Sequence, residues 1–318
     1  MAQKIVGVFN IMATPFDPGA DRRVDVISLR RLVDFQIDKG AYGLTILGVL
    51  GEAAKLSVEE RKLVVDTVMD TAAGRVPVVV GTSHNVTETC IQLSKDAFAA
   101  GAAGVMISPP RFDKPTDDLV LAFYDQVAGV IDQPIVVQDY PPVNNVFMSA
   151  SLLATLAERI PNARHLKLED PPLMQKITAI RALTDKYEIF GGLGGMFFLE
   201  ELKRGAAGTM TGFAFTEILV AVYQAFAERR FEDADQIFDH YLPLIRFENQ
   251  PVINLSIRKE LLYRRGAIAS PILRDPYVGL DDGTLDEINW ILRRVGIDNP
   301  VAKLNIQPGV FHGSRIKG

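Results

Sequence analysis

The chain has 318 residues, of which 48% are hydrophobic, and its formal net charge at pH 7 is −5. This composition can build a sizeable core, in one large domain or two medium ones. No cluster of Lys and Arg is long enough to follow a phosphate backbone, so nucleic acid is not an expected partner. The single cysteine, Cys90, excludes a disulfide within the chain and fits a reducing compartment.

The first predicted element is the apolar run of residues 5–13. It is short, its only preceding charged side chain is Lys4, and the break Thr14-Pro-Phe-Asp follows at once. These features favour a buried strand over the apolar region of a secretory signal. No apolar stretch approaches the ~20 residues needed to cross a bilayer, so we expect a soluble, cytoplasmic protein with no membrane partner.

Short apolar runs then alternate with amphipathic segments of helical period. Eight of the runs are strand candidates, and they begin near Val6, Leu44, Val76, Val105, Ile135, Arg164, Tyr187 and Gly208. Between them, Ser57 and Glu60 form a capping-box pattern at a helix start, and Ser28 precedes another helical pattern. Eight such βα units predict an α/β fold, the parallel (β/α)₈ or TIM barrel, rather than an open doubly wound sheet.

Three of the predicted helix-to-strand joints share the pattern Gly-Ala-x-Gly, starting at Gly40, Gly101 and Gly205. The first glycine suits the position just after a helix, and the second suits a tight entry into the next strand. A recurring joint of this kind is what a repeating α-to-β unit requires.

After Glu217 the strand pattern stops, and helical patterns remain around residues 220–228, 232–245, 253–264 and 284–294. We therefore predict a catalytic barrel domain of residues 1–225 and a C-terminal helical domain and tail of residues 226–318. The helical part is expected to pack on the barrel as an appendage. The tail begins near Pro300.

Chemistry in such barrels sits at the carboxyl ends of the strands, and Lys167 ends the sixth one. An apolar run leads into this lysine, and a break marked by Pro171 follows it. Burial disfavours the charged form of a lysine, so we expect an amine here to act as a nucleophile toward a carbonyl carbon. The plain alternative is a lysine at a strand edge whose amine reaches solvent.

The loops after strands seven and eight are rich in small residues, with the sequences Gly191-Gly-Leu-Gly-Gly195 and Thr209-Met-Thr-Gly212. Loops at this place often bind phosphate in barrels. No Lys or Arg accompanies them, and small residues serve equally to leave room around the middle carbons of a substrate. A phosphate site is therefore the second choice.

These motifs, in this order, resemble the dihydrodipicolinate synthase and N-acetylneuraminate lyase family. The resemblance covers about the first 215 residues and rests on Thr14-Pro-Phe, Gly48-x-x-Gly-Glu52, Leu56-Ser-x-Glu-Glu-Arg61, Lys114-Pro-Thr116, Pro141, Lys167 and Gly205-Ala-Ala-Gly208. It implies a Schiff-base enzyme on a (β/α)₈ barrel with a C-terminal helical domain, in which Lys167 forms an imine with pyruvate or another 2-keto acid. It also implies no cofactor beyond that covalent imine, and a homotetramer.

The resemblance further implies where the substrate binds. Its carboxylate is expected at the backbone N–H groups of one loop, formed by Gly48, Val49, Leu50, Gly51 and Glu52, with Glu52 bracing the loop. The family usually has two threonines where this chain has Val49 and Leu50, so only the backbone donors carry over, and a plain βα turn remains the alternative. Further substrate contacts are expected from Glu169, Gly191, Gly192, Met210 and Thr211.

Both proton-transferring tyrosines of the family are missing here. Gln138 occupies the place of the strand-five tyrosine, and Arg111 or Phe112 that of the tyrosine after strand four. An amide orients a hydroxyl or a water but does not titrate near neutrality, so another group must transfer the proton. Tyr140, two residues after Gln138, would lie on the same side of the strand and could replace the phenol, or it could pack beneath the loop.

Three titratable residues remain at the predicted barrel mouth: His84, Asp139 and Glu169. Histidine is the residue type whose ordinary pKa lies nearest neutrality, so His84 is the preferred acid or base, with a bracing role as its alternative. The other histidines, at positions 165, 240 and 312, show no paired ligand spacing. No metal site is predicted, and a metal-dependent aldolase is disfavoured.

The resemblance also separates family activities. The synthase that makes the lysine precursor holds a second carboxylated substrate with an arginine after strand five, where this chain has Val143. The branch that dehydrates L-2-keto-3-deoxyarabonate is more similar, through the motifs Gln138-Asp-x-Pro, Thr82-Ser-His, Lys167-x-Glu, Met210-Thr-Gly and Leu242-Pro-Leu-Ile-x-x-Glu-Asn. The leading expectation is a lyase that removes water from a 2-keto-3-deoxy sugar acid without cleaving a carbon–carbon bond.

Other outcomes stay open because Val49 and Leu50 make the expected pocket more apolar than a sugar acid would prefer. One is a pyruvate-dependent aldolase or hydratase-aldolase acting on a less hydroxylated 2-keto acid. Another is a synthase-like condensation. A third, from a different class, is a barrel that binds a 2-keto acid without turnover, since both family tyrosines are absent.

Overall fold

Eight parallel strands close into a barrel in which every strand pairs with its neighbours in chain order. The computed structural model describes residues 4–308. The strands are β1 (Gly7–Ile11), β2 (Gly43–Ile46), β3 (Val78–Gly81), β4 (Gly104–Ile107), β5 (Ile135–Asp139), β6 (His165–Leu168), β7 (Glu188–Gly191) and β8 (Gly208–Thr211). Pairing of β1 with both β2 and β8 closes the ring, which confirms the predicted (β/α)₈ barrel.

Both faces of each strand are buried, which explains why the strands appear in the sequence as continuous apolar runs. Side chains that point outward pack beneath the helices in the main core; Leu44, Val80 and Val137 are examples. Side chains that point inward form a second core inside the ring, from Ile5, Phe9, Ile11, Val79, Met106, Val136, Phe190 and Met210. The interior is thus filled below the carboxyl ends of the strands.

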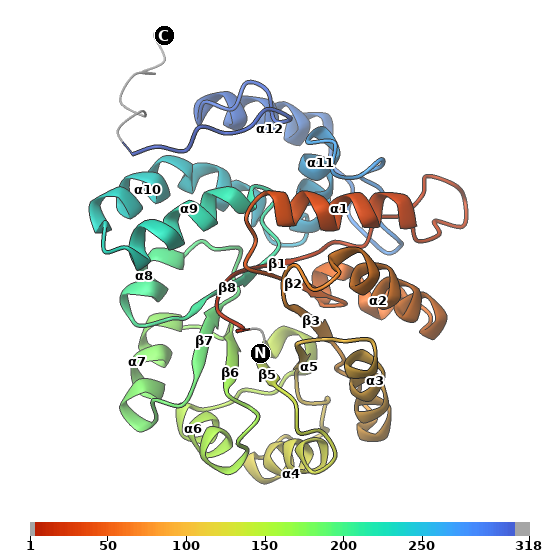
Figure 1. Cartoon of the computed structure of the whole chain (residues 1–318), viewed down its shortest axis with the longest axis vertical. Coiled ribbons are helices and arrows are strands. Elements are labelled where there is room, and N and C mark those ends of the chain that lie inside the picture. Colours follow the sequence, from red (N-terminus) through yellow and green to blue (C-terminus); the bar gives the residue numbers. More distant parts are fainter. Residues whose placement is uncertain (1–3, 309–318) are drawn as a thin grey trace.

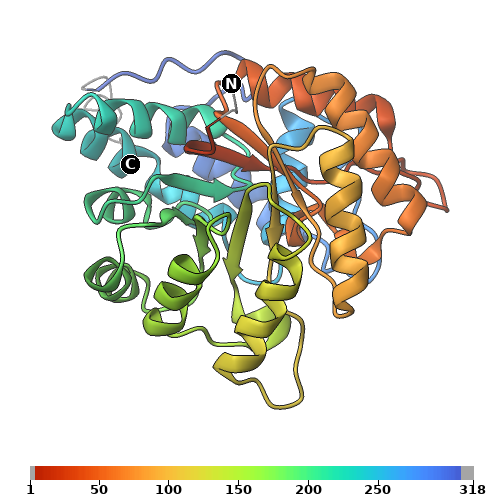
Figure 2. The same ribbon diagram turned by 60° about the horizontal axis from the view of Figure 1, so that its bottom comes forward.

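Helices surround the strands, as Figures 1 and 2 show from two directions. The barrel helices are α1 (Val26–Asp38), α2 (Val58–Ala72), α3 (Thr87–Ala99), α4 (Asp117–Ala128), α5 (Pro141–Asn144), α6 (Ala150–Arg159), α7 (Leu173–Leu183), α8 (Phe198–Lys203) and α9 (Thr216–Ala227). Two 3₁₀ turns, η1 (Val49–Gly51) and η2 (Ala53–Lys55), separate β2 from α2.

Of the two helix starts predicted from the sequence, the one at Ser57 is confirmed and the one at Ser28 is wrong. Ser57 and Glu60 form the capping box of α2, because the Ser57 hydroxyl accepts the Glu60 N–H and the Glu60 carboxylate accepts the Ser57 N–H. Ser28, by contrast, lies inside α1, which begins at Val26. The cap is Asp25, whose carboxylate accepts the Ser28 N–H at 3.0 Å, an N-cap that equally suits a helix start.

The Gly-Ala-x-Gly joints have the predicted geometry. Gly205 follows α8 with a φ of +82°, in the left-handed region that favours glycine, and Gly40 and Gly101 have φ values of +81° and +99°. Gly208 opens β8, where a Cβ would lie 1.9 Å from the carbonyl oxygen of Gly7. Only glycine therefore lets β8 approach β1 closely enough to close the barrel.

Three further helices follow the barrel: α10 (Phe231–Glu248), α11 (Asn254–Arg264) and α12 (Asp282–Arg294). Figure 1 shows them on the same side of the molecule as α1 and α9, opposite α4 and α6. They share the main core with the barrel helices, which confirms the predicted helical appendage. The domain boundary at residue 225 remains a prediction, and it falls in the last turn of α9.

The predicted tail is described from Pro300 as far as Pro308; the rest of it, with His312, lies outside the described residues. Within residues 4–308, no helix is both long enough and apolar enough to cross a membrane.

Candidate active site

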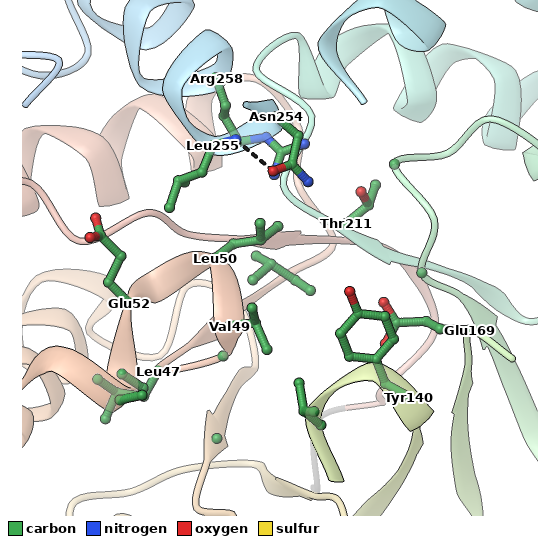
Figure 3. Close-up of a pocket in the computed structure, with 18 of the residues that line it drawn as sticks. Leu47, Val49, Leu50, Glu52, Tyr140, Glu169, Thr211, Asn254, Leu255 and Arg258 are labelled. Atoms are coloured by element: carbon green, nitrogen blue, oxygen red, sulfur yellow. Dashed lines mark hydrogen bonds between the residues drawn. The ribbon is translucent and has the colours of Figure 1, made fainter. Parts of the chain in front are cut away.

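A cavity of about 760 Å³ opens at the carboxyl ends of the strands. This volume lies within the range of about 300–1,000 Å³ typical of small-molecule sites. Its lower wall comes from the loops and ends of β2 to β8, and its upper wall from the segment that includes α11 and the residues after it. Figure 3 shows side chains from both parts converging on the same space.

Lys167 lies at the floor of this cavity. Its Cα is in register with that of Gln138 on β5 and that of Phe190 on β7, and its side chain points into the ring. Only 3% of the residue is exposed. The structure therefore places the lysine as expected, buried at the carboxyl end of a strand and facing the cavity.

The Lys167 amine shares a hydrogen-bond acceptor, one carboxylate oxygen of Glu169, with the side chain of Gln138. Lys167 Nζ donates to Glu169 Oε2 at 2.6 Å, and Gln138 Nε2 donates to the same oxygen at 3.0 Å. All three residues are buried and line the cavity. Attack on a carbonyl requires a neutral amine, and Glu169 is the group placed to take the proton from Lys167. The sequence had suggested burial as the activating influence; the structure adds a carboxylate that pairs with the amine and can accept its proton.

Glu169 is held in place by close packing. A Cβ on Gly192, after β7, would lie 2.5 Å from Glu169 Cγ, so only glycine fits beside this side chain. Gln138 fixes the carboxylate from the other side through its amide. The carboxylate is thus oriented toward the amine rather than toward solvent.

Tyr140 follows β5 and lines the cavity next to Glu169 (Figure 3). The residue is half-buried, and its hydroxyl has no hydrogen-bond partner within residues 4–308. Burial, with a smaller contribution from the Glu169 charge, raises the pKa of the Tyr140 phenol above its ordinary value. The phenol therefore stays protonated at neutral pH and is available as a proton or hydrogen-bond donor in the cavity.

The loop after β2 can offer two backbone donors. The η1 turn uses the N–H groups of Gly51 and Glu52, which donate to Gly48 O and Val49 O at 3.0 Å. The N–H groups of Val49 and Leu50 precede these bonds, and residues at the start of a helical turn have no acceptor within it. Gly48, Val49, Leu50 and Glu52 line the cavity, but Gly51 does not; it packs against Thr14, whose hydroxyl donates to Gly51 O at 2.7 Å.

Glu52 braces this loop against the C-terminal part of the chain. Its Oε1 accepts from Lys259 Nζ at 2.7 Å, and its Oε2 accepts from Lys55 Nζ at 3.0 Å and from the Arg274 N–H at 3.1 Å. Lys259 lies over the Phe16 ring, and burial lowers its pKa to about 8 against the opposing attraction of Glu52. These contacts favour the bracing role over proton transfer.

Four predicted residues do not lie on the cavity wall as expected. Besides Gly51, Met210 lies in the core inside the barrel, and Gly191 faces Glu201 on the helix side of β7. His84 lies in the loop after β3, where its Nδ1 accepts the Val86 N–H at 3.0 Å, and it does not line the cavity. The structure thus brings Lys167 together with Glu169, Gln138 and Tyr140, and not with His84.

Asp139 also lies away from the cavity. Its side chain points outward from β5, where it pairs with Lys176 of α7. Burial raises the pKa of Asp139 to about 6, opposed by the Lys176 charge. The expectation of a carboxylate at the barrel mouth is therefore met by Glu169 and not by Asp139.

The glycine-rich loop after β7 is closed by a side chain. Asn249, at the end of α10, donates from Nδ2 to Leu193 O at 3.3 Å. A Cβ on Gly194 would lie 2.4 Å from Asn249 Cγ, so the amide fills the space above this glycine. A phosphate would have to displace it, which favours the alternative that the small residues make room for a substrate.

Sequence reasoning missed the upper wall of the cavity. Its residues come from the region after α10 and include Asn254, Leu255, Arg258, Tyr277 and Val278. Arg258 is a charged residue among the apolar positions of α11, and this pattern could have indicated a buried polar contact there. Within residues 4–308, no group of three or more His, Cys, Asp and Glu side chains could hold a metal ion.

Comparison with known proteins gives concordant results. Residues 4–295 match the Dihydrodipicolinate synthetase family. An L-2-keto-3-deoxyarabonate dehydratase of Azospirillum brasilense is 36% identical over 296 residues, which cover 91% of this chain and 94% of that protein. A 4-hydroxy-tetrahydrodipicolinate synthase of Rhizobium meliloti is 29% identical over 296 residues, covering 92% and 98% of the two chains.

A solved structure is similar over the same extent. The crystal structure of a dihydrodipicolinate synthase from Rhodopseudomonas palustris has a TM-score of 0.85 and 36% sequence identity. The match covers 91% of this chain and 97% of that one.

Proposed function

Because this chain belongs to the dihydrodipicolinate synthetase family of lyases, we propose that Lys167 forms an imine with a 2-keto acid and that water is then eliminated from the substrate. The family resemblance expected from the sequence motifs is confirmed by the match over residues 4–295. Enzymes of this family use a lysine Schiff base with the substrate and need no external cofactor. The proposed substrate class is the 2-keto-3-deoxy sugar acids.

The first step is imine formation. Glu169 accepts a proton from Lys167 Nζ, and the neutral amine attacks the C2 ketone of the substrate to form a carbinolamine. The C2 hydroxyl of the carbinolamine then leaves as water and a protonated imine remains. The Tyr140 hydroxyl is the available donor of the proton that the leaving hydroxyl needs. The substrate carboxylate is held at the Val49 and Leu50 N–H groups, where backbone dipoles favour an anion.

The second step is elimination. Glu169 first passes the proton taken from Lys167 to the Tyr140 phenolate. The protonated imine then draws electrons from the C3–H bond, and the Glu169 carboxylate accepts the C3 proton to give an enamine. The enamine electron pair then forms a C3–C4 double bond as the C4 hydroxyl takes the proton from Glu169 and leaves as water. Hydrolysis of the imine regenerates Lys167. With a hydroxyl on C5, tautomerisation leaves an aldehyde there, and the net change is the loss of one water.

The observation that carries this proposal is the pair of buried hydrogen bonds that Lys167 and Gln138 donate to one carboxylate oxygen of Glu169. It supplies a nucleophile with an adjacent base at the floor of a cavity. Val143, which lines the cavity after β5, offers no charge for a second carboxylated substrate. This supports dehydration over a synthase-like condensation, and the 36% identity to a dehydratase agrees with it.

A second candidate is cleavage of the C3–C4 bond by an aldolase mechanism. The apolar side chains of Val49 and Leu50, both on the cavity wall, support a less hydroxylated substrate. The same imine would then accept electrons from the broken carbon–carbon bond, releasing an aldehyde and pyruvate.

Product analysis with a 2-keto-3-deoxypentonate tests the choice. Dehydration yields 2-oxoglutarate semialdehyde and no pyruvate, whereas cleavage yields pyruvate in proportion to substrate consumed. Detection of stoichiometric pyruvate would replace the dehydratase proposal with the aldolase one. Absence of both products would contradict both.

Two further expectations belong to the same proposal. We propose a cytoplasmic homotetramer, on the basis of the family resemblance and the single cysteine. Sedimentation of the purified protein tests its assembly: a tetramer mass is expected, and a monomer at micromolar concentration would contradict it.

A further inference from the structure

A buried arginine on the cavity wall has unused hydrogen-bond donors. Arg258, on α11, is 1% exposed and lines the cavity. Its Nε donates to Glu248 Oε1 at 2.6 Å, whereas Nη1 is buried with no partner. No residue within 4–308 accepts a hydrogen bond from Nη2 either. A buried donor without an acceptor is costly, so Nη1 favours an oxygen atom that the described residues do not provide.

The position of this guanidinium is fixed by its surroundings. The Glu248 carboxylate holds its Nε and also accepts the Ala214 N–H at 3.0 Å, so the carboxylate is itself anchored behind β8. A Cβ on Gly212, just after β8, would lie 3.0 Å from Arg258 Nη1. Glycine at this position therefore allows the guanidinium to reach the end of the barrel.

Two further polar side chains lie on the same wall, those of Asn254 and Thr211. Asn254 Oδ1 accepts the Leu255 N–H at 2.8 Å, which leaves the Nδ2 hydrogens of Asn254 for another acceptor. Figure 3 shows Arg258 and Asn254 together near Thr211, across the cavity from Tyr140. The Thr211 hydroxyl is also buried without a partner. This wall of the cavity is thus rich in donors, whereas Glu169, the hydrogen-bond partner of the Lys167 amine, lies beside Tyr140 on the other side (Figure 3).

We propose that Arg258 recognises an oxygen atom at C4 or beyond on the tail of the 2-keto acid, and so determines the substrate class. This inference rests on the imine at Lys167 proposed above, because that imine would hold C2 beside Glu169, across the cavity from Arg258. A hydroxyl is the expected oxygen, since Glu248 already neutralises the charge of Arg258. A second carboxylate would meet the repulsion of Glu248.

The test compares ligands that differ only in their tails. Imine formation is measured by borohydride trapping and mass spectrometry with pyruvate, 2-oxopentanoate, a 2-keto-3-deoxypentonate and 2-oxoglutarate. The variants are Arg258→Gln and, as a matched control on the same helix, Arg264→Gln, whose arginine pairs with Glu260. Arg258→Gln leaves the buried Glu248 without its partner, which could prevent folding. In that case the double variant Glu248→Gln/Arg258→Gln, which removes both charges, is tested with the same ligands.

Loss of a hydrogen bond to a charged group should raise the half-saturating concentration of the pentonate about 10- to 100-fold more than that of pyruvate or 2-oxopentanoate. Arg264→Gln should leave the ratio unchanged. An equal change for all ligands, or none, would overturn the inference, and a selective loss for 2-oxoglutarate would assign Arg258 to a carboxylate. If wild-type protein traps no ligand, the proposed imine itself fails, and the inference fails with it.

Discussion

Lys167 Nζ and Glu169 Oε2 lie 2.6 Å apart at the carboxyl end of β6, although the two residues are only two positions apart in sequence. Glu169 directly follows β6, and its N–H still donates to Asp139 O at 3.0 Å, so the alternation of the strand continues and both side chains face the barrel interior. Nucleophile and base are therefore contributed by one short segment. Their separation is set by the strand geometry rather than by a mobile loop.

Replacement of Glu169 by Gln keeps the shape of the side chain and removes the proton acceptor. We expect kcat for dehydration to fall about 10²- to 10⁴-fold, the range for loss of a general base. Steady-state assay of product formation measures this fall. The variant should keep its fold by circular dichroism, and a kcat close to that of the wild type would show that another group accepts the proton.

Replacement of Tyr140 by Phe distinguishes the two roles considered for this residue. If the phenol donates a proton in the cavity, removing its hydroxyl should lower kcat by about 10²-fold or more. If the ring only packs beneath the loop, phenylalanine should preserve activity. Parallel assay of Tyr140→Phe and wild type decides between them, and unchanged turnover would remove Tyr140 from the mechanism.

His84→Ala tests the other proposed acid or base. The imidazole accepts the Val86 N–H and lies outside the cavity, so we expect an effect on stability of about 1 kcal/mol from the lost hydrogen bond. The rate should stay close to that of the wild type, because the imidazole does not line the cavity. A loss of kcat comparable to that of Glu169→Gln would return His84 to the mechanism.

The ion pair between Glu52 and Lys259 should stabilise the loop after β2. Both residues are buried, and removal of one partner of such a pair costs about 3–5 kcal/mol of unfolding free energy. Urea denaturation of Lys259→Met should show this loss, together with a raised KM for the 2-keto acid. The double variant Glu52→Gln/Lys259→Met should recover part of the stability. Equal stability of wild type and Lys259→Met would contradict the bracing role.

Glu201 should make stability depend on pH. It is buried on α8, its Oε2 has no partner, and burial raises the pKa of the carboxyl from 4.5 to about 8. Between these values the unfolded state ionises and the folded state does not, so stability should fall as pH rises from about 4.5 to 8. Relative to Glu201→Gln, the wild type should lose about 2–5 kcal/mol across this window.

Denaturation at several pH values measures this difference, with the exposed Glu287→Gln on α12, away from Glu201, as control. The control should parallel the wild type. A constant difference between wild type and Glu201→Gln from pH 4.5 to pH 8 would show that Glu201 is not protonated in the folded state.

Most of the fold could be predicted because its signals are local. Each predicted strand starts within two residues of the observed one, since buried parallel strands are continuous apolar runs between amphipathic helices. The joint at Gly205 and Gly208 could be predicted from the sequence because the backbone geometry there demands glycine. The start of α1 was misplaced because Asp25 and Ser28 both suit an N-cap, and local sequence did not decide between them.

The site could be predicted only in part, because its contacts depend on packing between distant segments. The strand end marked Lys167, but the shared hydrogen bonds with Gln138 depend on the register of β5 and β6. Alternation along β5 would have separated Asp139, which points outward, from Gln138. The side chain of His84 lies in an irregular loop with no period to orient it. Arg258 reaches the cavity only because the C-terminal helices pack over the barrel.

The most direct test of the account is borohydride reduction in the presence of pyruvate, followed by peptide mapping with mass spectrometry. We predict that Lys167 carries a mass increase equal to pyruvic acid less one oxygen atom, because imine formation removes one water and reduction adds two hydrogens. Lys167→Met, assayed in parallel, should carry no adduct. An adduct on another lysine such as Lys176, or none on the wild-type protein, would contradict the assignment of Lys167 as the imine-forming residue.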